Sequence, residues 1–96
     1  MATDRERARE RAHAYLATAV PDFDARFTIV DDNTLDAGWC WVFFWDSKRA
    51  LETGELADAI AGNAPIAVDK ESGDVHVTGT AHPVEYYLEQ LRPGSD

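Results

Sequence analysis

The sequence has few of the features, such as paired cysteines and long apolar runs, that would assign it to a particular class of protein. It contains one cysteine, Cys40, so no disulfide can form within the chain. A lone cysteine is typical of a reducing compartment. The longest apolar run, Trp39–Trp45, is too short to cross a bilayer, and the charged first residues do not resemble a signal peptide. We therefore expect a soluble protein of the cytoplasm.

Positive charge is also scarce. Nine lysines and arginines face 18 acidic residues, which gives a net charge of −9. Four arginines and three acidic residues lie within the first 21 positions, so the rest of the chain holds the whole negative excess. Such a field repels nucleic acid and anionic membranes and speeds association with a basic protein. Acidity also simply keeps proteins soluble, so charge alone leaves both interpretations open.

Motifs for catalysis and for metal binding are missing. The only histidines are His13, His76 and His82, and their spacing matches no zinc motif. No G-x-S-x-G, P-loop, G-x-G-x-x-G or H-E-x-x-H pattern occurs. Cys40 lies between two tryptophans, a position typical of a small buried hydrophobic residue. The sequence therefore predicts no enzyme, no metal and no cofactor. A small hydrolase that uses Cys40 with His76 or His82 is the minor alternative.

The apolar pattern predicts an α+β fold in a single domain, residues 1–96. Thr3 and Glu6 form a capping box, and Pro21 ends the helix that follows. The apolar stripe of this helix consists of Ala8, Ala12, Tyr15, Leu16 and Ala19. Strands are predicted over 27–30, 39–45, 64–68 and 74–78, with an irregular segment over 46–54, a short helical turn over 55–60 and a last helix from Pro83. We expect a four-stranded, mostly antiparallel sheet, with the turn between strand pairs and both terminal helices on one face.

Glycine, asparagine and proline mark the turns. Gly73 suits the positive φ of a hairpin bulge between the last two strands. Pro83 suits the first position of the last helix, where its missing N–H is no loss. The full set of predicted turn residues is Gly54, Gly62, Asn63, Pro65, Gly73 and Pro83. These residues are architectural in this interpretation.

The aromatic strand is the one unusual local feature. Alternation places Trp39, Trp41, Phe43 and Trp45 on one face, and Cys40, Val42 and Phe44 on the other. One interpretation is core packing, because a small domain needs large side chains. The other is that the tryptophans are interface anchors, a role in which tryptophan is enriched. The predicted partner-binding residues are then Trp39, Trp41 and Trp45 with a charged rim of Asp46, Glu52, Glu55 and Asp58.

Four blocks from Gly38 onward resemble a known family. They are the aromatic strand with Ser47, the segment Leu51–Gly54, then Leu56 with Ala61–Ile66, and finally Val68–Gly73 leading to Gly79-Thr80 and Pro83–Leu88. In this order they resemble the YrhB-like proteins, grouped with the immunity protein 35 family of bacterial polymorphic-toxin systems. Ser72 departs from the threonine more usual at its position.

The resemblance spans roughly residues 38–91 and implies a small α+β domain encoded beside a toxin, which it neutralises. It supplies no catalytic residues, and some family members are treated as chaperones. We therefore expect a protein partner, with a basic toxin as the candidate, and neither nucleic acid nor membrane. The alternative is a heat-stable, holdase-type chaperone for non-native proteins. Monomer and homodimer both stay open.

Overall fold

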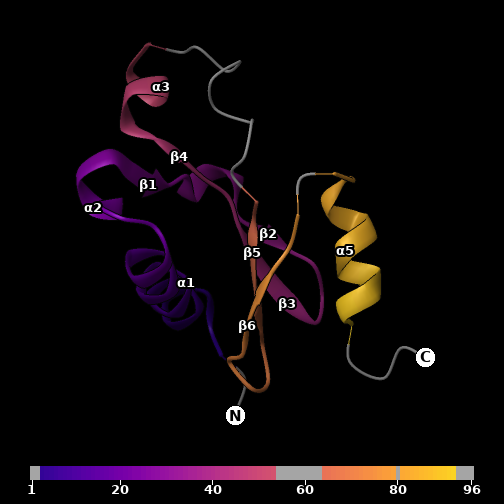
Figure 1. Ribbon diagram of the computed structural model, residues 1–96. Coiled ribbons are helices and arrows are strands. Elements are labelled where there is room, and N and C mark those ends of the chain that lie inside the picture. Colours follow the sequence, from indigo (N-terminus) through magenta and orange to yellow (C-terminus); the bar gives the residue numbers. More distant parts are fainter. Residues whose placement is uncertain (1–2, 54–63, 80, 93–96) are drawn as a thin grey trace.

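The computed structural model describes residues 3–53, 64–79 and 81–92 (Figure 1). Its elements are α1 (Arg5–Ala19), α2 (Phe23–Arg26), β1 (Phe27–Ile29), a 3-10 turn (Asp31–Asn33), β2 (Leu35–Asp36), β3 (Cys40–Phe43), β4 (Trp45–Ser47), α3 (Lys48–Thr53), β5 (Ile66–Asp69), β6 (Val75–Val77) and α5 (Val84–Leu91). The predicted helical turn over 55–60 lies outside the described residues, as do Gly54, Gly62 and Asn63. The α+β class, with a helix near each end of the described chain, is confirmed.

The strands form two antiparallel sheets. Four strands pair in the order β2-β3-β5-β6, and β1 pairs with β4 in a second sheet. The single strand predicted over 39–45 is therefore wrong: β3 ends at Phe43, the chain leaves the larger sheet at Phe44, and β4 then pairs with β1. The backbone N–H of Val30 donates to the Phe44 carbonyl at 2.8 Å, which joins the two sheets at the break. The irregular segment predicted after Trp45 instead contains the rest of β4 and α3.

Helix α1 begins one residue later than the capping box suggests. Asp4 is its N-cap, and its carboxylate accepts from the Arg7 N–H at 2.8 Å. Thr3 is buried, its N–H donates to the Lys70 carbonyl, and its own carbonyl accepts from the Trp41 indole at 3.1 Å. The predicted Thr3 cap is wrong because these bonds hold Thr3 against the sheet. The helix ends at Ala19, before the proline, as predicted.

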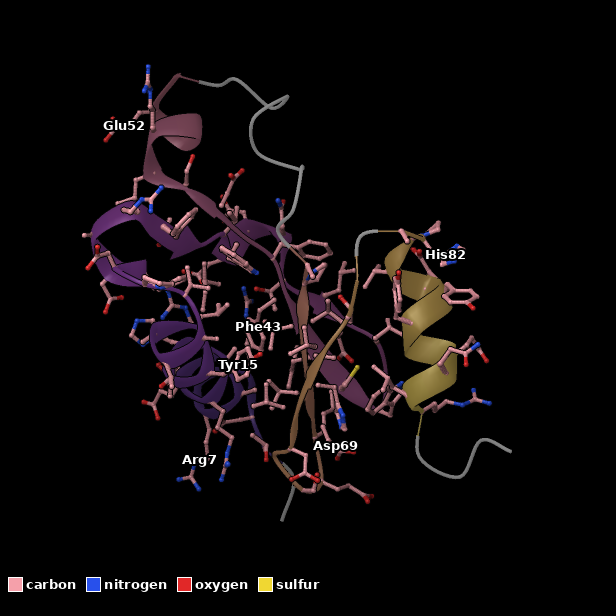
Figure 2. All side chains as sticks on the ribbon, in the orientation of Figure 1. Arg7, Tyr15, Phe43, Glu52, Asp69 and His82 are labelled. Atoms are coloured by element: carbon pink, nitrogen blue, oxygen red, sulfur yellow. The ribbon has the colours of Figure 1, made fainter. Side chains whose placement is uncertain are left out.

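Each face of the larger sheet has its own core. On one face, Ala8, Ala12 and Leu16 of α1 meet a cluster formed with Phe23, Ile29, Phe43, Ile66 and Val68. On the other, Cys40, Val42 and Ala67 lie under the half-buried Val84 and Leu88 of α5. The two helices therefore cover opposite faces, with the strands between them (Figure 1). Phe43 lies between the sheet and α1 (Figure 2).

This arrangement corrects the expectation that both helices share one face. Alternate residues of β3 and β5 are apolar on both sides, so each side of the sheet needs a cover. The stripe of α1 is also narrower than predicted, because Tyr15 is 38% exposed and Ala19 is exposed as well.

The hairpin of β5 and β6 follows the predicted turn chemistry. Gly73 has a φ of 77°, and its N–H donates to the Asp69 carbonyl at 2.9 Å. The Asp69 carboxylate accepts from the N–H groups of Glu71 and Ser72 at 2.7 and 3.0 Å, so this buried acid shapes the turn. Pro65 enters β5, and Pro83 is the N-cap of α5 rather than its first residue.

Candidate protein-binding surface

Trp41 takes part in the interior contacts of the protein. Its indole N–H donates to Thr3, and the Lys70 ammonium lies 4.4 Å from the centroid of its ring. The half-buried ring therefore connects the start of the chain, the strand β3 and the β5–β6 turn. These contacts favour the core-packing interpretation of Trp41 over an interface anchor.

Trp45 also contributes to packing within the fold. Its indole N–H donates to the Ala64 carbonyl at 2.8 Å. Its ring centroid lies 5.8 Å from that of Phe23 and 5.3 Å from that of Phe27. Trp45 therefore joins the small sheet to α2 and to the entry of β5.

Trp39 does not share a face with the other two tryptophans. It is half-buried against the core cluster on the α5 side, and its ring meets that of His76 edge to face at 6.0 Å. The predicted common face is wrong because Trp39 lies before β3 begins. The preceding Gly38 has a φ of 91°, so strand alternation does not extend back to Trp39.

Of the predicted acidic rim, the structure describes Asp46 and Glu52. Asp46 is only 7% exposed, and its carboxylate accepts from the Ser47 N–H at 2.7 Å, so this acid is engaged within the fold. Glu52 is exposed on α3, on the opposite side of the molecule from His82 and α5 (Figure 2). Glu55 and Asp58 lie outside the described residues.

Cys40 is in no position to act as a nucleophile. It is completely buried in β3 on the α5 side of the sheet. Burial raises the pKa of its thiol to about 11, with a smaller contribution from the Asp69 carboxylate. The reactive thiolate form is therefore suppressed near neutral pH. Within the described ranges, no three His, Cys, Asp or Glu side chains are grouped in a way that could hold a metal ion.

A small cleft of about 150 Å³ lies between α1, α2 and β1. Polar side chains that line it already have partners: His13 Nε2 lies 2.5 Å from Asp24 Oδ1, and Lys48 donates to the backbone carbonyl of Asp24. Arg9, which also lines it, is paired with Asp31 at 2.6 Å. These bonds connect neighbouring elements, so the cleft is part of the scaffold.

The outward side of α5 carries a feature that the sequence reasoning missed. The half-buried Val84, Tyr87, Leu88 and Leu91 face the sheet, whereas Glu85, Tyr86, Glu89 and Gln90 are exposed. We call these four exposed residues the α5 outer face. Tyr86 is 47% exposed, and its ring centroid lies 4.2 Å from that of His82 and 5.3 Å from that of Tyr87. The sequence did contain a signal for this face, because a helical wheel of α5 places the aromatic Tyr86 among polar residues.

Comparison with known proteins places this geometry in a family. The model of the family described as immunity protein 35 matches residues 6–90. The chain belongs to the immunity protein 35 family. The match runs from the first turn of α1 to the last turn of α5, so it includes both covered faces of the sheet and the α5 outer face.

A curated relative of this immunity protein 35 family member also matches part of its chain. The uncharacterized protein YrhB of Escherichia coli (strain K12) is 49% identical over 49 residues, which are 51% of this chain and 52% of the E. coli protein. The chain therefore spans about half the length of the relative it matches. No solved structure matches it. No helix within the described residues is long and apolar enough to cross a membrane.

Proposed function

We propose that this protein binds a cognate bacterial toxin and neutralises it by occlusion in the cytoplasm. The observation that carries the proposal is the immunity protein 35 match over residues 6–90. The net charge of −9 supports it, because an acidic surface favours a basic partner.

The contact surface of this proposal differs in part from the one predicted from the sequence. Trp39 stays a proposed contact residue because it is half-buried at the edge of the α5-side core. Glu52 stays one because it is exposed, and Glu55 and Asp58 remain proposed with it. The indole N–H groups of Trp41 and Trp45 are used within the protein, so we give these two a supporting role.

Co-expression tests the proposal. The gene for this protein is expressed in a bacterial host together with the toxin gene encoded beside it, under separate promoters, and growth is followed. We expect growth arrest by the toxin alone and restored growth with both, with an equimolar complex on size-exclusion chromatography. Stopped-flow association should slow as salt screens the acidic surface. Unrelieved toxicity at matched expression, with no complex, would refute the immunity role.

A chaperone role is the second candidate, and exposed apolar residues favour it. Leu35, Val77 and Tyr86 are large side chains that remain more than 40% exposed on a strongly acidic body. Such a surface can hold non-native clients in solution. Suppressed heat aggregation of unrelated enzymes near equimolar ratios would support it, and undiminished light scattering at a large molar excess would exclude it.

A further inference from the structure

We propose that the α5 outer face is a recognition site for an arginine side chain of a partner protein, with Tyr86 as the stacking surface and Glu85 and Glu89 as its counter-ions. The inference rests on the proposed function only for the identity of the partner. The site itself is carried by ring geometry, exposure and local charge.

The ring geometry supplies a flat surface for a cation. Tyr86 is stacked at a tilt of 34° on His82 and stands almost perpendicular to Tyr87, at 89°. The hydroxyl end of Tyr87 in turn lies against Gly79, where an added Cβ would come within 2.6 Å of the hydroxyl oxygen. Tyr86 is therefore supported by its neighbours although it remains 47% exposed. Its fixed π-face can attract a cation without first losing much rotamer freedom.

The charges around the ring select the chemistry of the occupant. Glu85 and Glu89 are one helical turn apart and exposed, one residue before and three residues after Tyr86, and the first basic residue after the ring is Arg92 at the end of the helix. An apolar partner would remove water from both carboxylates without replacing it, which is costly. A cation would neutralise them, and the net charge of −9 would attract it from a distance.

Arginine fits this surface better than lysine does. A guanidinium group is planar, so it can lie on the Tyr86 ring while its N–H groups point sideways to a carboxylate. An ammonium is a compact, strongly hydrated charge without a flat face to lay on the ring, so the same pair of contacts costs it more of its hydration and fits less closely. The occupant is therefore an arginine-bearing segment of the partner, and a lysine-bearing segment is the discriminating comparison.

The face can be altered without disturbing the core. Within Val84–Leu91 no residue is buried, and Glu85, Tyr86 and Glu89 are exposed and belong to neither core cluster. Substitutions there should leave the fold intact. A matched control exists in Tyr15, an exposed tyrosine on α1 that lies on the other side of the molecule from His82 and α5 (Figure 2).

The test uses the full chain and a defined probe, the peptide acetyl-Gly-Arg-Gly-Arg-Gly-amide, with lysine and glutamine versions as comparisons. Binding is followed by NMR through the amide signals of the protein and the δ-methylene protons of the peptide arginines. We expect shifts concentrated on residues 82–90, and an upfield ring-current shift of the arginine δ-protons. The glutamine peptide should give neither, and the lysine peptide should bind more weakly.

The variants separate stacking from general attraction. Tyr86→Phe keeps the π-face and should bind as the wild type does, whereas Tyr86→Leu should weaken the arginine peptide by about two- to fivefold. Tyr15→Leu should change nothing. Shifts spread over acidic residues throughout the chain, or equal affinity for Tyr86→Leu, would overturn the site.

A growth-protection assay and a toxin-binding assay then test whether the site contributes to recognition of the toxin. Tyr86→Leu and the pair Glu85→Gln with Glu89→Gln should lower the affinity for the toxin, whereas Tyr15→Leu should not. If the wild type fails to protect, the proposed function is wrong whatever the peptide shows. If the wild type protects and the α5 variants bind the toxin as tightly as it does, the function holds and the inference is wrong.

Discussion

Replacing Gly73 with alanine should destabilise the protein more than the same change at Gly38. Both glycines have left-handed backbone angles, 77° at Gly73 and 91° at Gly38. A Cβ at Gly38 would meet nothing within 4 Å, whereas at Gly73 it would lie 2.8 Å from Nε of Arg11. The two substitutions therefore share the same backbone strain and differ in one steric contact.

The expected magnitudes follow from these two effects. A left-handed alanine costs about 1–2 kcal/mol, and the stiffer unfolded chain returns about 0.4–1 kcal/mol. Gly38→Ala should thus lower the free energy of unfolding by about 1 kcal/mol. At Gly73 the Arg11 side chain must also move aside, and because the obstructing atoms are the far end of a flexible, exposed side chain, this adds only about 0.5 kcal/mol. Gly73→Ala should therefore cost about 1.5 kcal/mol in total.

Urea denaturation followed by tryptophan fluorescence measures the difference. Each glycine variant is made in the wild type and in an Arg11→Ala background, which removes the obstructing side chain. The excess cost at Gly73 should vanish in that background, giving a coupling energy of about 0.5 kcal/mol, while the cost at Gly38 should stay the same. Equal costs for the two glycines, or an excess that persists without Arg11, would refute the steric reasoning.

Three further predictions concern single side chains. Burial raises the pKa of Cys40 to about 11, so as pH rises the unfolded chain loses this thiol proton before the folded chain does. Stability should therefore fall between about pH 8.5 and 11. In Cys40→Ala, the urea midpoint should depend less steeply on pH over that range. The hydrogen bond from Lys70 lowers the pKa of Asp36, so the stability from this pair is present above the ordinary carboxyl pKa and is lost as pH falls through the lowered pKa. In Lys70→Met, an NMR titration should show a higher pKa for Asp36. An unchanged pKa would contradict the assignment. Phe43 is completely buried, so Phe43→Ala should cost about 3–5 kcal/mol in urea melts, whereas Tyr15→Ala should stay within about 0.5 kcal/mol of the wild type.

The sequence predicted correctly the features that depend on residues close together in the chain. The stop of the first helix, the β5–β6 hairpin and the last helix rest on a proline, on Gly73 and on an apolar stripe, and each formed as predicted. The capping box failed by one residue because Thr3 is held by Lys70 and Trp41, which are distant in sequence.

The aromatic run shows where local reasoning stops. Nothing in Trp39–Trp45 reveals that the strand breaks at Phe44, because the break depends on which remote segments pair on either side of it. The face occupied by Trp39 is likewise set by the turn before it. Asp46 looked like a surface charge, but its burial in β4 depends on the surrounding fold. For the candidate site, the sequence supplied the partner class, whereas the exposure of Tyr86 required the packing of α5.

The way α5 sits on the sheet has a consequence for how this protein can evolve. Its inward residues are half-buried and hold the helix in place, while its outward residues are exposed and lie outside both cores. Random substitutions at Glu85, Tyr86, Glu89 and Gln90 can therefore accumulate without crossing a stability threshold. A lineage can exchange one binding specificity for another on this helix while the two cores stay the same.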